Sequence, residues 1–149
     1  MSGYAGVHGK GAVSLMDILE SVRANKNFQK AGALGIFIGV VRGETLDGKK
    51  VEKMELEAYE EKANESLKSI CDDLRKREGI IDAQIHHLLG EFNVGEDLVY
   101  VVIAGVHRNN VFSALEEAVE RYKKEAPIFK KEYRIEKEGT RKSLWISEG

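Results

Sequence analysis

The sequence is poor in the residues that form cross-links or bind metals. Its 149 residues contain one cysteine and four histidines. The single thiol, Cys71, permits neither an internal disulfide nor a cysteine-rich metal cage, and its helical surroundings predict a buried, inert side chain. His86 and His87 are neighbours on a predicted strand and would point to opposite faces, and His8 lies among the first residues. We therefore predict no metal site.

The chain also lacks a long apolar run and a strong excess of one charge. No stretch approaches the length of a membrane span, and the amino terminus has no apolar signal-peptide segment. We therefore expect a cytoplasmic protein that does not enter a membrane. The formal net charge is −2, which argues against nucleic acid as a partner and confines any anion site to a local cluster of cations. The length predicts a single domain, residues 14–149, after a flexible N-terminal segment, residues 1–13.

The order of the apolar patterns predicts an α+β fold with a mainly antiparallel sheet. Ser14, with Asp17 three residues later, is typical of a capping box and opens the first expected helix. The alternation in 51–59 leaves one strand face in water, which favours helices on one side of the sheet. Two further helices are expected, over 60–77 and from Asn109 or Asn110 onward. Strands are expected over 35–41, 51–59, 80–87, 98–106 and 143–146.

The only proline stands between two lysine pairs. The segment 122–132 reads Tyr-Lys-Lys-Glu-Ala-Pro-Ile-Phe-Lys-Lys-Glu. Because proline cannot continue a helix, Lys123 is expected on the last helical turn and Lys130 on the extended segment beyond it. The chain reversal could aim both amines into one pocket. Taken alone, such a segment is more often a solvated charge run at a helix C-terminus.

Further cations follow two of the expected strands. Arg42 follows the strand 35–41, while His107 and Arg108 follow the strand 98–106 and precede a helix N-terminus, which favours an anion. Arginine offers phosphate a planar fork, and lysine adds a compact charge. If the two strands are neighbours, these three residues and the two lysines converge on one basic pocket.

Three short blocks contain most of these cations. They are Gly39-Val40-Val41-Arg42-Gly43, Gly105-Val106-His107-Arg108 and Ala126-Pro127-Ile128-Phe129-Lys130-Lys131-Glu132. In this order and spacing they resemble the signatures of the molybdopterin synthase large (catalytic) subunit, the MoaE family. The similarity extends from about Gly32 to Trp145. It implies an α/β-hammerhead-like core with a small antiparallel subdomain.

The resemblance also implies a function. Members of that family transfer sulfur from the thiocarboxylated C-terminus of a ubiquitin-like small subunit to cyclic pyranopterin monophosphate, which makes the dithiolene of molybdopterin for molybdenum cofactor biosynthesis. By resemblance Lys123 is the catalytic residue, as an acid or base or through a transient bond to the acyl group, and Lys130 stabilises negative charge. A homodimer of large subunits within a heterotetramer is implied, with no cofactor and no metal. The implied substrate-binding residues are Val40, Val41, Arg42, His107, Arg108, Lys123, Lys130, Lys131 and Glu132.

Two other functions fit the same residues. A relative without turnover could still dock a ubiquitin-like tail or a pterin, although a module that only binds would not need both Lys123 and Lys130. A small α+β domain could instead bind a nucleotide or RNA in the same basic cleft. Aromatic residues make up only 7% of the chain, which gives few platforms for stacking bases and argues against this last function.

Overall fold

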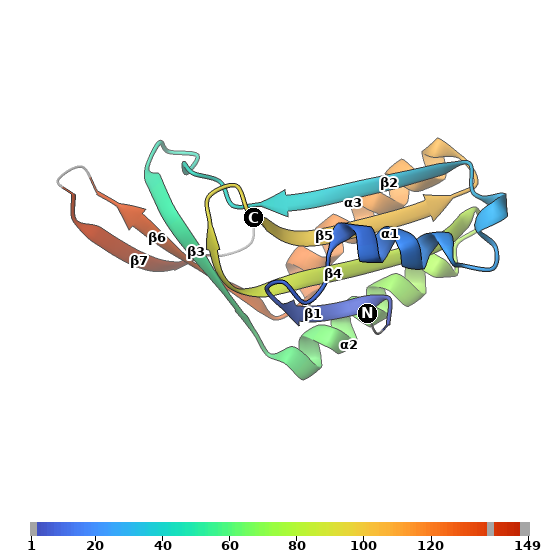
Figure 1. Ribbon diagram of the computed structural model, residues 1–149, viewed down its shortest axis with the longest axis horizontal. Coiled ribbons are helices and arrows are strands. Elements are labelled where there is room, and N and C mark those ends of the chain that lie inside the picture. Colours follow the sequence, from blue (N-terminus) through green and yellow to red (C-terminus); the bar gives the residue numbers. More distant parts are fainter. Residues whose placement is uncertain (1–2, 137–138, 147–149) are drawn as a thin grey trace.

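The computed structural model describes residues 3–136 and 139–146 of the chain. These residues form seven strands, three α-helices and one short 3-10 helix (Figure 1). The elements follow one another as β1 (Ala5–Gly9), α1 (Leu15–Arg23), η1 (Phe28–Lys30), β2 (Ala33–Val40), β3 (Lys50–Ala58), α2 (Glu60–Arg75), β4 (Ile80–Asn93), β5 (Asp97–Gly105), α3 (Arg108–Glu125), β6 (Ile128–Ile135) and β7 (Arg141–Ile146). Helices and strands are mixed along the chain, which confirms the expected α+β class.

All seven strands belong to one sheet with two parts. The strand order is β2-β5-β4-β3-β6-β7, and β1 adds to β4 as the one parallel pair among the described residues. We call β1, β2, β4 and β5 the main sheet, and β3, β6 and β7 the small sheet, which lies at the left in Figure 1. Strand β4 joins them, because residues 80–87 pair with β5 and residues 90–93 pair with β3. Gly90 lies at this change of partner, with a φ of 126° that favours glycine.

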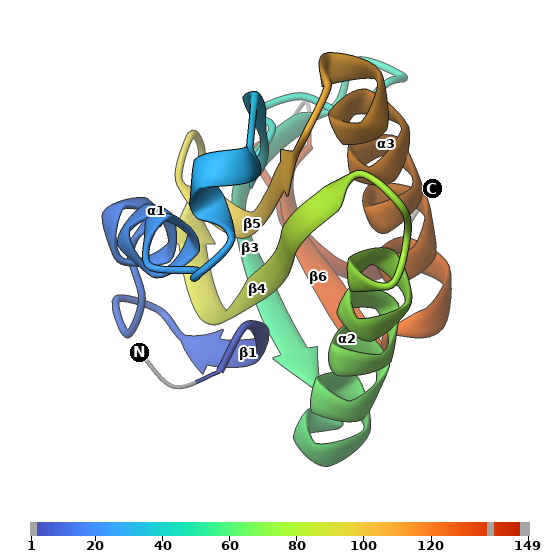
Figure 2. The same cartoon turned by 90° about the vertical axis from the view of Figure 1, so that its right-hand side faces the viewer.

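Helices cover both faces of the main sheet. Helices α2 and α3 lie side by side on one face, and α1 lies on the other, as Figure 2 shows. Strand β5 is consequently buried from Leu98 to Gly105. This differs from the expectation of helices on one side. The alternation in 51–59 belongs to β3 in the small sheet, so it carried no information about the main sheet.

The N-terminal residues also differ from the expected flexible segment. Residues Ala5–Gly9 form β1, in register with β4 from Ile85 to Leu89. Val13 is 5% exposed and belongs to the core. A five-residue strand with two glycines has no alternation that a sequence pattern can detect. Residues 1 and 2 lie outside the described residues.

Two of the predicted helix boundaries are confirmed and one is wrong. Ser14 Oγ accepts a hydrogen bond from the Asp17 N–H (3.2 Å), and the Asp17 carboxylate accepts one from the Ser14 N–H (3.0 Å), which is the predicted capping box. Helix α3 ends before Pro127. It begins earlier than expected, because His107 is the N-cap and the Asn110 side chain accepts a hydrogen bond from the His107 N–H at 3.3 Å. The side chain of Asn110, in the first turn of α3, thus satisfies the N–H of the N-cap residue His107.

Strand β4 is longer than the sequence pattern indicates, and strand β6 is absent from the predicted strands. Strand β4 continues through Gly90 to Asn93, where a loop was expected, since the change from β5 and β1 to β3 keeps its backbone paired. Strand β6 occupies the segment after Pro127 and pairs with β3 on one edge and β7 on the other. Its charged side chains show no apolar alternation, so only the backbone pairing reveals it.

Candidate active site

The last turn of α3 carries Lys123. The preceding residue, Tyr122, is 3% exposed, and its ring meets the ring of His87 edge-on, with the centroids 5.7 Å apart. Lys123 is half-buried and has no ion pair among the described residues. The side chain of Lys124 is 78% exposed and lies 3.9 Å from Glu120. The helix therefore holds Lys123, and not Lys124, against the body of the protein.

Strand β6 places Lys130 and Glu132 on one face. Residues directly opposite in antiparallel strands project to the same side. Lys130 is opposite Leu56, and Glu132 is opposite Met54. Both of these partners belong to the hydrophobic core. Lys130 and Glu132 thus extend from the core-facing side of the small sheet, immediately after the α3–β6 corner that carries Lys123.

Lys131 lies on the other face of β6. It is opposite Glu55 on β3 and Trp145 on β7. Its ammonium lies 5.5 Å from the Trp145 ring centroid and 5.7 Å from that of Tyr133. Tyr133 in turn donates a hydrogen bond to Glu55 Oε2 at 2.8 Å. We expected Lys131 to line the pocket of Lys130, but the alternation of the strand turns its side chain away.

Glu132 has a partner that the sequence reasoning missed. Its side chain is 8% exposed, and its carboxylate accepts a charged hydrogen bond from Arg134 Nε. Arg134 is two residues further along β6 and projects from the same face. The spacing of Lys130, Glu132 and Arg134 was the available signal, because a strand alternates with a period of two.

Arg42 leaves the main sheet at the end nearest the α3–β6 corner. The preceding residue, Val41, is 2% exposed. It donates a hydrogen bond to the Glu96 carbonyl (3.0 Å) and accepts one from the Gly95 N–H (2.9 Å), which ties the end of β2 to the β4–β5 turn. Val40, one residue earlier, is 51% exposed. This end of the main sheet therefore holds Val40, Val41 and Arg42, as well as the corner with Lys123.

His107 and Arg108 lie at the opposite end of the main sheet. Strands β2 and β5 are neighbours, as expected, but they are antiparallel, with Ala33 opposite Gly105. The length of β2, about 23 Å, separates the two groups of cations. Figure 1 shows the start of α3 and the tip of β2 at opposite ends. The expectation that one chain brings all these cations into one pocket is therefore wrong.

The start of α3 has its own chemistry for an anion. His107 and Arg108 are both exposed. The first N–H groups of a helix lack helical acceptors, and they carry the positive end of the helix dipole. A phosphate at this position would meet backbone N–H groups and two basic side chains. Within the described residues, the cations of the sequence blocks thus lie in two separate groups, which we call the two cationic sites.

The three described histidines near β4 form hydrogen bonds with each other and with nearby polar groups. His86 and His87 point to opposite faces, as predicted, since His86 Nδ1 lies 2.8 Å from His8 Nε2 while His87 contacts Tyr122. His86 Nε2 lies 2.9 Å from Gln84 Oε1, which can only accept. His86 therefore carries its proton on Nε2 and accepts from His8. Within the described residues no group of three or more His, Cys, Asp or Glu side chains is placed to hold a metal ion.

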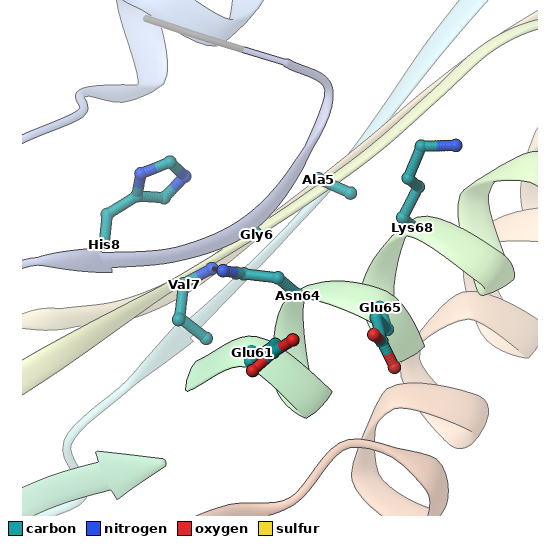
Figure 3. A pocket seen from close by; sticks show the side chains of 8 residues that line it. All are labelled: Ala5, Gly6, Val7, His8, Glu61, Asn64, Glu65 and Lys68. Carbon is teal, nitrogen blue, oxygen red and sulfur yellow. Dashed lines mark hydrogen bonds between the residues drawn. The ribbon is translucent and has the colours of Figure 1, made fainter. Parts of the chain in front are cut away.

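Cys71 and the pocket beside β1 lie outside both cationic sites. Burial raises the pKa of the Cys71 thiol to about 12, so the prediction of a buried, inert thiol is confirmed. Figure 3 shows a pocket between β1 and α2, where Asn64 Oδ1 accepts a hydrogen bond from the Val7 N–H at 2.8 Å. The residues that line it are Ala5, Gly6, Val7, His8, Glu61, Asn64, Glu65 and Lys68.

The chain is thus an α+β protein in which a main sheet and a small sheet form a hammerhead-like arrangement. It carries two cationic sites. A family model described as MoaE protein matches residues 10–125. The chain is 38% identical to the molybdopterin synthase catalytic subunit of Pyrococcus abyssi over 143 residues, or 93% of each chain. It is also 38% identical to the protein of that name from Bacillus subtilis, over 70% of this chain and 66% of that one. The chain belongs to the MoaE family, which confirms the resemblance of the three sequence blocks.

Solved structures agree with this membership. The chain is similar to molybdopterin synthase from Staphylococcus aureus, with a TM-score of 0.82 and 29% identity over 99% of both chains. It is also similar to a chain in the complex of subunits 1 and 2 of the molybdopterin-converting factor from Helicobacter pylori, with a TM-score of 0.70 over 93% of this chain and 88% of that one. At 22% identity this second likeness shows the fold alone. No helix in the described part of the chain is long and apolar enough to cross a membrane.

Proposed function

We propose that this chain is the catalytic subunit of molybdopterin synthase. It transfers sulfur from the thiocarboxylated C-terminus of a ubiquitin-like small subunit to cyclic pyranopterin monophosphate. The observation that carries this proposal is the α3–β6 corner, where a half-buried Lys123 without a described ion partner adjoins the strand that presents Lys130. Membership of the MoaE family supports the substrate and the reaction.

Each lysine has a distinct role in the proposed reaction. The thiocarboxylate tail of the small subunit would approach the corner. There Lys123 would move a proton, or its amine would bond to the acyl carbon while the carbon–sulfur bond breaks and the sulfur stays on the pterin. Lys130, fixed on a paired strand, would stabilise the negative charge that develops during transfer. Arg42, which is exposed at the same end of the main sheet, would contact the substrate. The reaction needs no cofactor in this scheme, because the partner supplies the sulfur.

Two copies of the chain would complete the substrate site. Strand β2 is an edge of the sheet, and Ile36, Ile38 and Val40 on it are 41%, 38% and 51% exposed. A row of exposed apolar side chains on an edge strand favours association. A two-fold axis near the middle of β2 would set two β2 strands antiparallel. His107 and Arg108 of the second copy would then lie beside Arg42 of the first.

The partners and the location belong to the same proposal. The Helicobacter pylori complex contains two different subunits. In our proposal a small subunit binds to each of two copies of this chain, which makes a heterotetramer. The single cysteine is buried and free, as is common in reducing compartments. A cytoplasmic enzyme is consistent with both points.

A coupled assay tests the proposed function. The chain is mixed with a thiocarboxylated ubiquitin-like partner and cyclic pyranopterin monophosphate, and the dithiolene product is measured for wild type, Lys123→Ala and Lys124→Ala. We expect product from wild type and from Lys124→Ala, and none from Lys123→Ala. Partner binding without product from wild type would indicate a docking module. Absence of partner binding would overturn the assignment.

A further inference from the structure

A buried carboxylate lies among the cations of the proposed site. Glu132 is 6% exposed and shares its face of β6 with Lys130, about 7 Å away along the strand. Phosphate and thiocarboxylate are both anions, so a negative charge at this distance opposes their approach to Lys130. Burial strengthens this repulsion, because little water screens it. An anion site here requires a group that offsets Glu132.

Arg134 is placed to be that group. Its Nε donates to Glu132 Oε1, and the two side chains are 17% and 8% exposed. Arg134 is opposite Val51 on β3, and the Val51 N–H donates to the Gly43 carbonyl at 3.0 Å. Strand β6 is therefore connected at Arg134, through β3, to the segment that follows Arg42.

We infer that Arg134 is a positioning residue of the sulfur-transfer site. It neutralises Glu132 and holds the carboxylate along the strand, so that the charge of Lys130 acts on the anionic substrate. This inference rests on the proposed function, because it concerns the same anion site. Arg134 itself contacts no reacting atom and acts through Glu132.

The other charged groups near Arg134 are exposed. Asp47 interacts with it electrostatically from the β2–β3 loop, but the Asp47 side chain is 66% exposed. Lys142 is directly opposite Arg134 on β7 and is also exposed. Water screens both charges. Glu132 is thus the group whose charge Arg134 chiefly offsets, and Lys142 provides a matched control of equal charge.

The test is a series of variants that differ in charge at these two positions. Binding of cyclic pyranopterin monophosphate to the chain is measured by titration calorimetry for wild type, Arg134→Gln, Arg134→Lys, Glu132→Gln and the double variant Glu132→Gln/Arg134→Gln. We expect Arg134→Gln to weaken binding about 10-fold, and Arg134→Lys to recover most of that loss. The double variant regains affinity relative to Arg134→Gln, and Glu132→Gln binds at least as tightly as wild type. Lys142→Gln changes affinity less than about 2-fold.

The order of affinities separates positioning from a purely structural role. If Arg134 only supports the fold, the double variant binds no better than Arg134→Gln, and the inference is overturned. It is also overturned if Arg134→Gln binds like wild type or if Glu132→Gln weakens binding. Circular dichroism checks that each variant folds. Should Arg134→Gln not fold, Glu132→Gln and the double variant still decide the question, because a direct substrate role for Glu132 predicts weaker binding in both.

Failure of the inference and failure of the proposed function give different results. A wild-type chain that binds no cyclic pyranopterin monophosphate contradicts the proposed function. A wild-type chain that binds it, while the variants do not follow the order of their charges, contradicts only the role of Arg134.

Discussion

The ring of Tyr122 meets the ring of His87 edge-on, and this contact fixes the last turn of α3 to β4 at the end of the main sheet that also holds Arg42. Lys123 is the next residue along the helix, so the packing of one aromatic ring sets the position of the proposed catalytic amine. Edge-to-face rings of this kind contribute about 0.5–1.5 kcal/mol beyond the area that they bury. The proposed chemistry thus depends on a buried contact of the helix, in addition to the lysine itself.

Replacing Tyr122 tests this dependence. Tyr122→Ala is expected to lower the free energy of unfolding by about 3–5 kcal/mol, because the ring is buried and its removal leaves a cavity. Sulfur transfer should fall as well, since the last turn of α3 loses its anchor. Tyr122→Phe keeps the ring contact with His87 and should retain most of the activity. Urea denaturation and the coupled assay, run on both variants, provide the measurement; equal activity in the two would contradict the anchoring role.

Acid should destabilise the protein through His86. Burial, and secondarily the charge of His8, lowers the pKa of His86 from 6.5 to about 4. Between pH 4 and pH 6.5, His86 is therefore protonated in the unfolded chain but neutral in the folded chain. Stability from this group is complete above pH 6.5 and is lost as the pH falls toward 4, by about 3 kcal/mol in total.

The control for this pH dependence is His86→Gln, which cannot titrate. Denaturant unfolding of wild type and variant is compared at pH 7 and pH 4.5. We expect the difference in unfolding free energy between the two pH values to be smaller in the variant. The same difference in both proteins would show that other groups cause the loss.

Gly35 allows α3 to approach β2 closely. A Cβ at this position would lie 2.4 Å from Val111 Cγ1 and 3.4 Å from Leu115 Cδ2. Gly35→Ala should therefore destabilise the fold by about 1–3 kcal/mol, as overpacking usually does. Gly9→Ala is the matched control, because nothing lies within 4 Å of its Cβ. Melting temperatures compare the two, and an equal effect would exclude crowding at Gly35 as the cause.

Mixing two inactive variants tests the shared substrate site. Arg42→Ala and a His107→Ala/Arg108→Ala double variant are each expected to lose activity, since each removes cations from one of the two cationic sites. Subunit exchange between them creates dimers with one intact site and one site that carries both defects. Activity should return to about a quarter of the wild-type value in an equal mixture. If the mixture stays inactive although dimers exchange, the two cation groups do not act across an interface.

The sequence predicted the local features better than their arrangement in space. The helix stop before Pro127 and the Ser14 cap depend on neighbouring residues, and both are confirmed. The direction of β5 relative to β2 depends on contacts between residues far apart in the chain. That direction decides whether Arg42 and His107 meet, and no local pattern reports it. The three sequence blocks identified the family, but they do not show how far apart their residues lie in the folded chain.

The faces of β6 were predictable in principle. A period of two places Lys130, Glu132 and Arg134 together and sets Lys131 apart, once the segment is known to be a strand. The charged sequence of β6 shows no apolar alternation, so it did not predict a strand. Without the strand, Lys130 and Lys131 were expected to line the same pocket. Arg134, the partner of Glu132, could have been predicted only from this alternation. Strand β1 was hidden in a different way, since its pairing with β4 involves backbone groups and leaves no apolar pattern.

The change of partners at Gly90 divides the molecule into regions of unequal protection against amide exchange. Before Gly90, β4 is bonded to β5 on one edge and to β1 on the other, and helices cover both faces of the sheet around it. Beyond it, residues 90–93 of β4 pair with β3 of the small sheet. We therefore expect the small sheet, with Lys130 and Glu132, to open more often than the main sheet. A partner tail that binds at the α3–β6 corner would slow amide exchange in β6 first. The exchange rates of amides in the middle of β4 would change little.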